Sequence, residues 1–439
     1  MKLNAPRRAL MATLAAAAMP RPAAAQLPPA RTVSLFTWSR AVEQVREHAA
    51  AFSRATGLRV SHQHVPWGNY RSALAARLRP DTPLDVVWMS DSWLAEFAWG
   101  GHLAALDENR PLAAIARESI PFCQAAMRDG GRLWGVPYYT DYVTLIINTR
   151  MLTEGGITQA PTTWAELAAQ CAQLKGMGLS ERPLVIPLAN DPWLPEMLHA
   201  MAFSFGTRFA DFATGPAVGE DAQRLAAMLH FLREAAAPDG ILSPRALTTS
   251  EDTAFQDFAD GEHAFALMPS YRLFQLNDPQ RSSIAGHVRV GLMPDGEGAT
   301  GHRTCAWVRF YSMTAAADPA RRQAATALMS AFGGRDWTGN FTLQRNLLRD
   351  LGLPACFSMR DAGMEDMVAF LARETGSAEV LYEQRQRLLP KPVEAPWFAA
   401  WITATAPGWI SVLAGHMTPQ EMIETSRQIW NGLRLARGR

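Results

Sequence analysis

The sequence predicts an α/β fold with more than one lobe. Residues 32–89 alternate strand, helix, strand, helix, strand, a pattern typical of doubly wound sheets. The last of these strands, 84–89, is apolar throughout, as expected of a parallel strand covered on both faces. A chain of 439 residues is also too long for one core, since single cores stop growing at about 250–300 residues. These observations predict two lobes, each with a mostly parallel sheet flanked by helices.

The elements follow in order from the first strand, 32–38. An amphipathic helix over 42–52 comes next and Gly57 ends it, before an alternating strand at 58–65. We expect Asn69 to cap the helix that follows. Further on, Thr163 with Glu166 and Thr418 with Glu421 have capping-box spacing at the starts of helices. The remaining expected elements are strands within 133–148, 263–268, 288–293 and 305–313, helices over 194–238, a helix from 318, and a helical C-terminal part.

The N-terminus has the three parts of an export signal. Lys2, Arg7 and Arg8 are followed by the apolar segment 9–19 and by a cleavage site at 23–25, three alanines. The apolar segment is shorter than the roughly 20 residues that a membrane-spanning helix needs. We therefore expect residues 1–25 to be a cleaved signal peptide. The pair Arg7-Arg8 leaves the twin-arginine route open beside general secretion.

The four cysteines, Cys123, Cys171, Cys305 and Cys356, are widely scattered. None follows the signal, so we expect no lipid anchor on a processed N-terminal cysteine. A free exported protein needs an outer membrane to retain it, which predicts a Gram-negative periplasm. Disulfides are permitted there, but their pairing does not follow from spacing, and buried free thiols are the alternative.

Charge and composition narrow the classes of partner. The chain has 42 basic and 41 acidic residues and a formal charge of +1, which gives no reason to expect nucleic acid or an anionic membrane. Fourteen tryptophans are unusual. Because indole is bulky and amphipathic, this excess indicates either many half-buried anchors or a cleft lined with rings.

Two motifs suggest metal binding or catalysis. The adjacent Tyr138 and Tyr139 could chelate ferric ion with Asp141 or Asp91, and the two aspartates could instead perform glycoside hydrolysis. No H-E-x-x-H, G-x-S-x-G or P-loop motif is present. We expect both aspartates to accept hydrogen bonds from ligand hydroxyls, with no catalysis, metal or cofactor.

Four segments then occur in a recognisable order. They are 35–60, which begins Leu-Phe-Thr-Trp; 84–107, with Leu-Asp-Val-Val-Trp-Met-Ser-Asp; 131–167, with Gly-Arg-Leu-Trp-Gly-Val-Pro-Tyr-Tyr-Thr-Asp; and 258–294. The third is the most specific, and the order holds from about residue 32 to the C-terminal helices. In these segments the sequence resembles the extracellular solute-binding proteins of ABC transporters, family 1, the maltose-binding-protein-like sugar binders.

The resemblance implies a two-lobed periplasmic binding protein fold of type II, with ligand bound in the interlobe cleft. Matching the strand crossings implies hinges near 138–142, 288–294 and 343–350. Lobe one would combine residues 32–140 with 292–345, and lobe two residues 141–291 with 346–439. A ligand that touches both lobes stabilises the closed form through its preference for that form.

The resemblance also implies a set of ligand-binding residues at turns, crossings and presented rings. These are Trp38, Ser39, Arg40, Asp91, Tyr138, Tyr139, Asp141, Trp193, Ser270, Tyr271 and Trp397. To them we add Trp67, Trp307 and Arg309, which lie at predicted strand ends, where open α/β sheets present ligands. Sugar faces stack on rings, while sugar rims need planar hydrogen-bond partners.

This chain departs from the family at two places: residues 269–272 stand where the family often has Gly or Trp, and the bulky segment 306–309 stands where it commonly has a small, Gly-rich stretch. If Arg40, Arg272 or Arg309 points inward, the ligand carries a carboxylate, sulfonate or phosphate, because guanidinium pairs with such groups through two bonds. We expect a monomeric periplasmic protein that delivers a carbohydrate or carbohydrate derivative to an ABC permease. The alternatives are an anionic small solute of the sugar-sulfonate or glycerol-phosphate type, a polyamine and ferric ion.

Overall fold

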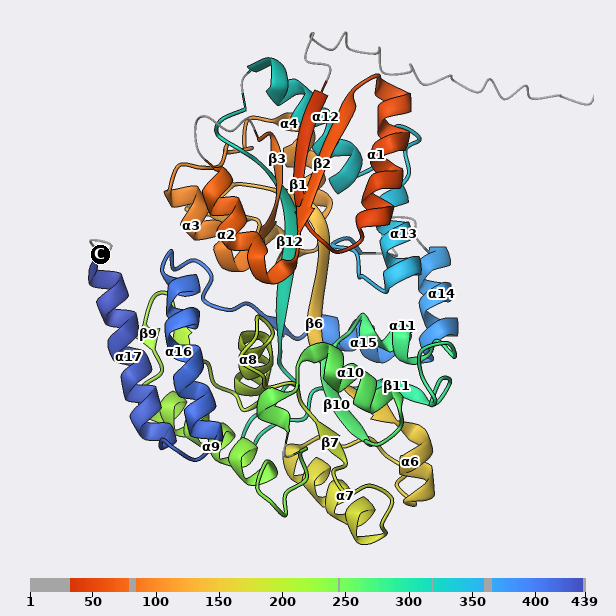
Figure 1. Cartoon of the computed structure of the whole chain (residues 1–439), viewed down its shortest axis with the longest axis vertical. Coiled ribbons are helices and arrows are strands. Elements are labelled where there is room, and N and C mark those ends of the chain that lie inside the picture. Colours follow the sequence, from red (N-terminus) through yellow and green to blue (C-terminus); the bar gives the residue numbers. More distant parts are fainter. Residues whose placement is uncertain (1–31, 79–83, 244, 318, 359–364, 437–439) are drawn as a thin grey trace, which may run out of the picture.

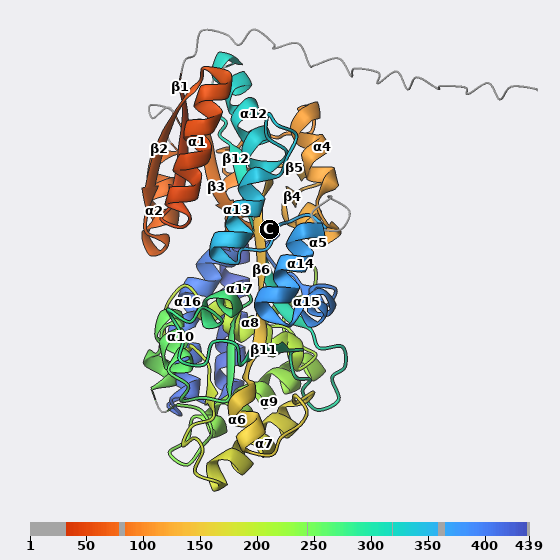
Figure 2. The same cartoon turned by 90° about the vertical axis from the view of Figure 1, so that its right-hand side faces the viewer.

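Two lobes lie one above the other along the long axis of the molecule, and two long strands run through the middle (Figures 1 and 2). The computed structural model describes residues 32–78, 84–243, 245–317, 319–358 and 365–436. The signal peptide expected at residues 1–25 lies outside these ranges. Within them, no helix combines the length and the apolar character needed to cross a membrane.

The upper lobe in Figure 1 begins with the three predicted strands, and β1 pairs in parallel with both β2 and β3. All of β3 is buried, as its apolar sequence requires. The elements up to the first crossing are β1 (Thr32–Trp38), α1 (Val42–Thr56), β2 (Arg59–Val65), α2 (Trp67–Arg77), β3 (Val86–Ser90), α3 (Asp91–Trp99), α4 (Arg110–Glu118), α5 (Pro121–Ala126), β4 (Arg128–Asp129), β5 (Arg132–Leu133) and β6 (Val136–Asn148).

The lower lobe follows β6 along the chain and mixes short strands with helices. Its sheet contains β10, which is antiparallel to β6 and parallel to β7. The elements are α6 (Thr149–Glu154), α7 (Trp164–Gly176), β7 (Leu184–Val185), α8 (Leu194–Ser204), β8 (Ala210–Asp211), β9 (Gly215–Pro216), α9 (Gly219–Ala235), a 3-10 turn (Ala246–Thr248), α10 (Glu251–Ala259), β10 (Phe265–Pro269), α11 (Arg272–Leu276) and β11 (Val288–Gly291).

The last third of the chain returns to the upper lobe and then comes back down. Strand β12 carries the chain up, and the helical pair α16 and α17 packs on α9 at the lower left of Figure 1. The elements are β12 (Thr304–Met313), α12 (Pro319–Gly333), α13 (Thr342–Leu351), α14 (Glu365–Thr375), α15 (Ala378–Arg385), β13 (Leu388–Leu389), α16 (Phe398–Leu413) and α17 (Pro419–Ala436).

One continuous sheet joins the lobes, in the order β2-β1-β3-β12-β6-β10-β7, with β11 on β6 and β13 on β12. The first half of β6 pairs with β12, and its second half pairs with β10 and β11. The segment after α13 is a third connection, since Thr140 N donates to Pro354 O at 3.1 Å. Three connections therefore meet near residues 139–142.

Contacts of two segments near the expected lobe boundaries indicate the lobe against which each segment lies. Asp295 bridges to Thr163, and Gly296 N donates to Ser204 O at 2.8 Å, so residues 295–296 lie against the lower lobe. Helix α13 (Thr342–Leu351) packs on α1 of the upper lobe.

Local sequence signals set most helix starts. The capping boxes are confirmed: Thr163 and Glu166 exchange side-chain to backbone hydrogen bonds, as do Thr418 and Glu421. The prediction for Asn69 is wrong, because α2 already begins at Trp67 with Pro66 at its N-cap. Proline at this position has the fixed φ that suits a helix entry, so the helix starts two residues earlier.

The Tyr70 hydroxyl ties two strands of the upper lobe together, and this generates a stability prediction. It is fully buried and donates to Phe36 O at 3.0 Å and to Trp88 O at 2.8 Å. We expect Tyr70→Phe to lower the free energy of unfolding by about 1–2 kcal/mol, measured by urea denaturation.

Tyr138→Phe is the matched control. The Tyr138 hydroxyl is equally buried but has no hydrogen-bond partner among the described residues. Its removal should leave the stability unchanged or raise it. Equal losses in the two variants would mean that the Tyr70 hydrogen bonds do not stabilise the fold.

Candidate ligand-binding cleft

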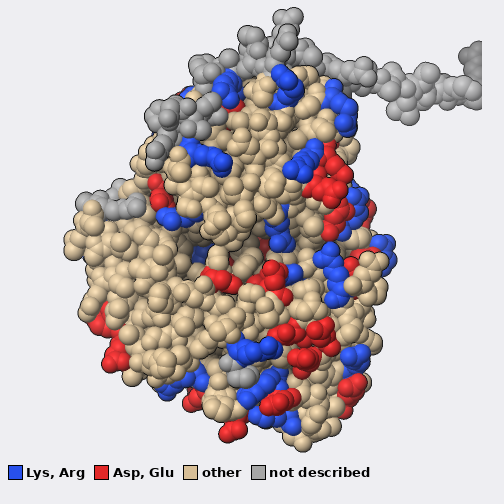
Figure 3. Space-filling view, in the orientation of Figure 1, with Lys and Arg blue, Asp and Glu red and all other residues tan. Residues whose placement is uncertain are grey.

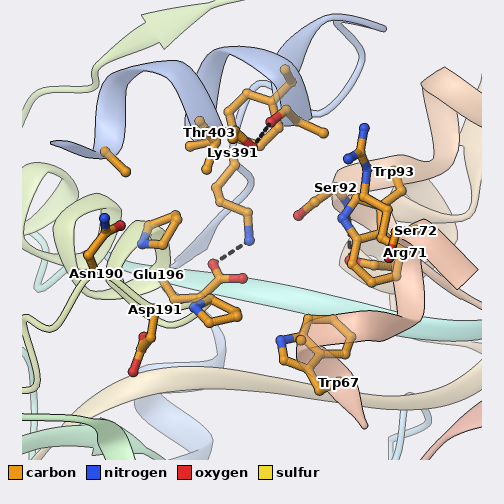
Figure 4. Close-up of a pocket in the computed structure, with 18 of the residues that line it drawn as sticks. Trp67, Arg71, Ser72, Ser92, Trp93, Asn190, Asp191, Glu196, Lys391 and Thr403 are labelled. Atoms are coloured by element: carbon orange, nitrogen blue, oxygen red, sulfur yellow. Dashed lines mark hydrogen bonds and ion pairs between the residues drawn. The ribbon is translucent and has the colours of Figure 1, made fainter. Parts of the chain in front are cut away.

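A cavity of about 450 Å³ opens between the lobes. The face seen in Figure 3 is hollowed at mid-height, and acidic and basic side chains lie close together there. Helices α2 and α3 contribute one wall, and the segment before α8 together with α16 contributes the other (Figure 4). The lining residues are Trp67, Gly68, Arg71, Ser72, Ser90, Ser92, Trp93, Asn190, Asp191, Pro192, Pro195, Glu196, Arg309, Lys391, Phe398, Ala399, Ile402, Thr403 and Ala406.

The upper wall is aromatic. Trp67 starts α2 and Trp93 lies in the first turn of α3, and their rings stack with centroids 4.9 Å apart. Trp38, buried at the end of β1, presents its ring edge-on to Trp67 at 4.9 Å and supports it from behind. Both Trp67 and Trp93 remain partly exposed in the cleft. Partly exposed indole faces of this kind suit the apolar C–H faces of a sugar or polyol.

The floor of the cleft is a buried network of four charged side chains. Arg309 on β12 pairs with Asp91 at 3.0 Å and lies 3.7 Å from Glu196 of α8. Glu196 also pairs with Lys391, which is 1% exposed and follows β13. Burial alone would lower the pKa of Lys391, but the Glu196 carboxylate overcomes this and raises it to about 12. The network therefore contains two cations and two anions.

Both oxygens of Asp91 accept hydrogen bonds from the protein. Its Oδ1 accepts hydrogen bonds from Arg309 and from Ser92 N, at 3.0 and 2.8 Å, and its Oδ2 accepts one from Val308 N at 3.0 Å. Ser90 Oγ also accepts a bond from Arg309 at 2.9 Å. The carboxylate thus holds the Arg309 guanidinium in place and ties the start of α3 to β12.

A second polar cluster lies where the strands cross. Asp141 Oδ1 accepts bonds from Tyr142 N at 2.8 Å and from the backbone and hydroxyl of Ser270, at 3.2 and 2.5 Å. The Arg40 guanidinium lies 4.0 Å above the Tyr271 ring. Asp141 Oδ2 and Arg40 Nε are buried without a hydrogen-bond partner in the described part of the chain. Buried groups of this kind are able to bind a polar ligand atom.

Comparison with known proteins gives these features a family context. A model of the family described as bacterial extracellular solute-binding protein matches residues 47–338. The chain belongs to this family. A probable ABC transporter-binding protein of Deinococcus radiodurans is 24% identical over 262 residues, which are 58% of this chain and 61% of that protein. The chain thus matches less than two thirds of that relative's length.

Solved structures of other solute-binding proteins share the fold. Maltose-bound MalE3 of T. maritima superposes with a TM-score of 0.77 at 20% identity, covering 92% of this chain and 99% of that one. An ABC transporter solute-binding protein of Thermotoga lettingae, bound with α-D-tagatose, gives 0.76 at 16% identity over 92% and 99%. The predicted two-lobed α/β fold of maltose-binding type is confirmed.

The predicted site residues of this solute-binding protein fall into three groups. Trp67 and Arg309 line the cavity. Directly behind it are Trp38, Asp91, Trp193 and Trp307, with Trp193 edge-on to Trp307 at 5.4 Å. The cluster at the strand crossing contains Arg40, Tyr139, Asp141, Ser270 and Tyr271. Tyr139 links the groups, since its hydroxyl contacts Arg309 and lies near Arg40.

Three predicted residues lie elsewhere. Ser39 is exposed and bonds His64 at 2.9 Å. Tyr138 is in the core, stacked on Trp88 at 4.3 Å, so its phenol does not join a site with the carboxylates. Trp397 is buried against Trp430 at 5.5 Å, at the start of the C-terminal helical pair. Among the described residues, no group of three or more His, Cys, Asp or Glu side chains could hold a metal ion.

Several lining residues were not predicted from the sequence. Trp93 could have been found, because it follows the apolar strand 84–89 by only four residues, at a carboxyl end where ligands bind. Glu196 lies in the first turn of α8, three residues after the predicted site residue Trp193. Lys391 has no local signal, because its role depends on the distant Glu196. Other polar lining residues outside the predicted set include Arg71, Ser72, Ser92, Asn190 and Thr403.

Asp141 generates a prediction for the pH dependence of stability. Burial raises the pKa of this carboxyl from 3.8 to about 7. The folded state therefore binds a proton that the unfolded state releases between these values, and stability falls as the pH rises toward 7. We expect Asp141→Asn, which keeps an acceptor for Ser270, to melt at least about 2 °C above the wild type at pH 8.

The difference should shrink as the pH falls toward 4, because the wild-type carboxyl is then protonated in both states. Melting curves from pH 4 to pH 8 measure it. The control is Asp252→Asn, which alters a carboxylate that is 89% exposed. A difference between Asp141→Asn and the wild type that does not change with pH would contradict this assignment.

Proposed function

We propose that this protein captures a neutral carbohydrate or polyol in the interlobe cleft and delivers it to the permease of an ABC importer. The observation that carries the proposal is the stacked Trp67–Trp93 wall facing a charge-balanced polar floor. A sugar needs both parts: rings for its C–H face and fixed donors and acceptors for its hydroxyl rim. The solute-binding family and the sugar-bound relatives with this fold support the same class of ligand.

The charge of the cleft favours a neutral ligand over an anion. Each cation in its lining has a carboxylate partner: Arg309 has Asp91, Lys391 has Glu196, and Arg71 has Glu96 at 2.7 Å. Asp191 adds a further acidic group to the lining. The lining and its direct partners therefore do not form the excess positive charge that a sulfonate or phosphate would require.

The lobes close by rotating about the three connections. We propose that lobe one combines residues 32–140 with β12 and the chain up to residue 357, and lobe two combines 141–303 with the chain from 358. This division moves the expected boundaries at 292 and 345, because Asp295 contacts Thr163, α13 packs on α1, and Phe357 bridges to Ser119. Ligand held between Trp67 on one lobe and α16 on the other would favour the closed form.

The cellular setting is part of the same proposal. Residues 1–25 direct export, by the general or the twin-arginine route, and the mature protein works as a free monomer in a Gram-negative periplasm. The family to which the chain belongs is extracellular, in agreement with this. Its role is binding, without catalysis.

The experiment is a ligand screen followed by a variant. Mature protein is tested by thermal shift against neutral mono- and disaccharides and polyols, including maltose, D-tagatose and D-mannitol. For the tightest of these, Trp67→Ala should weaken binding about tenfold or more in calorimetry, because it removes the stacking face.

Trp337→Ala is the control, since Trp337 is 43% exposed and does not line the cleft. It should bind the ligand as tightly as the wild type. If no neutral compound raises the melting temperature, or if the two variants behave alike, the proposed ligand class is wrong.

Salt dependence separates neutral from charged ligands. We expect the affinity for the tightest compound to change less than about twofold between 50 and 500 mM NaCl, because no net charge is neutralised on binding. A fall of tenfold or more would indicate an ionic ligand instead. Calorimetry at the two salt concentrations makes the comparison.

A further inference from the structure

Two of the four cysteines lie side by side in the upper lobe. Cys123, Cys171, Cys305 and Cys356 are all buried free thiols in this structure. Cys123 lies in α5, and Cys356 lies in the connection that leaves α13 for the lower lobe. They are 233 positions apart in sequence, so only the tertiary fold brings them together.

Backbone contacts hold the two cysteine segments against each other. Ile120 N donates to Cys356 O at 2.9 Å, and Ser119 forms an antiparallel bridge with Phe357. Cys123 follows Ile120 by three positions at the start of α5, so both residues are on the face that meets Cys356. The two thiols contact each other there, with neither side chain exposed.

The other two cysteines provide a contrast. Cys171 lies within α7 of the lower lobe, and Cys305 is the second residue of β12, where its sulfur lies 3.6 Å from Glu196. In the described part of the chain, neither of these two thiols interacts with another cysteine.

We propose that Cys123 and Cys356 form a disulfide in the exported protein, and that it fastens the third interlobe connection to α5. The proposal depends on the export part of the proposed function and not on the nature of the ligand. Oxidising compartments outside the cytoplasm maintain disulfides, and adjacent thiols held by rigid backbone are the geometric requirement.

The chemistry is thiol–disulfide exchange with a protein disulfide of the exporting compartment. One cysteine thiolate attacks the oxidant's disulfide to form a mixed disulfide, and the second thiolate then displaces the oxidant as a dithiol. The pair loses two electrons and two protons, which the oxidant takes up. Burial raises the pKa of the Cys356 thiol, which slows further exchange once the folded protein encloses the pair.

The bond would act next to the hinge. Pro354, two residues before Cys356, accepts the hydrogen bond from Thr140 N, beside Asp141. Fixing Cys356 to α5 anchors this connection on the upper lobe, so that rotation of the lower lobe pivots below it. The linkage also closes a long loop, which restricts the unfolded chain.

Peptide mapping of the full-length exported protein tests the bond directly. Protein from the periplasm of a Gram-negative host is alkylated during lysis, denatured, alkylated again and digested without reductant. We expect a linked peptide containing Cys123 and Cys356, with Cys171 and Cys305 alkylated. Alkylation of all four cysteines, or linkage of a different pair, would overturn the proposal.

Melting temperatures test whether the proposed disulfide stabilises the protein. Reductant should lower the melting temperature of the wild type by about 5 °C or more. Cys123→Ala and Cys356→Ala should each lose this response, and the double variant should melt close to the single ones. Cys171→Ala, also a buried cysteine, should keep the response. A reductant effect that persists in Cys356→Ala would overturn the proposal, whatever sugar the protein binds.

Discussion

A buried network of four charged side chains connects segments of the two lobes on either side of the cleft. Asp91 belongs to the upper lobe, Arg309 to the strand that crosses between the lobes, and Glu196 and Lys391 to segments below. Removing ions from water is costly, and such a group is stable only when every member keeps its partner. The network thus constrains the position of α3, β12, α8 and the chain after β13 at once. The fold around the cleft depends on that constraint.

The same constraint determines which side chains are available to a ligand. Both oxygens of Asp91 accept hydrogen bonds from the protein, and through them the carboxylate orients Arg309. Arg309 in turn lies 5.0 Å from the Trp67 ring centroid, so the charge stiffens the aromatic wall. At the strand crossing, Asp141 Oδ2 and Arg40 Nε have no hydrogen-bond partner among the described residues. The cleft thus has a partly exposed aromatic wall, and unpaired buried polar atoms lie at the strand crossing.

Local patterns predicted the elements well and the contacts poorly. The apolar run 84–89 and the alternating apolar and polar residues at 58–65 correspond to β3 and β2. The pattern of apolar residues along a strand reflects which of its faces are buried, so it can be read from the strand's own sequence. Both capping boxes formed, since each needs only residues three apart. Asn69 was misjudged because Pro66 offers an earlier entry to the helix. Tyr138 and Trp397, equally aromatic and equally placed near turns, packed into cores, because residue type does not say which side of an element faces the cleft.

By itself, the sequence determined the α/β elements, the two-lobed family and a pool of aromatic and charged residues, since periodicity, caps and ordered motifs are local properties. Only the tertiary structure decided which of these residues line the cleft and which pair with one another or pack into the core. Lys391 meets Glu196 across 195 positions and Cys356 meets Cys123 across 233, and neither pairing leaves a trace in nearby residues. Whether a cation is free for an anionic ligand or already neutralised depends on such distant partners. Charge balance in the cleft is therefore a property of the folded chain.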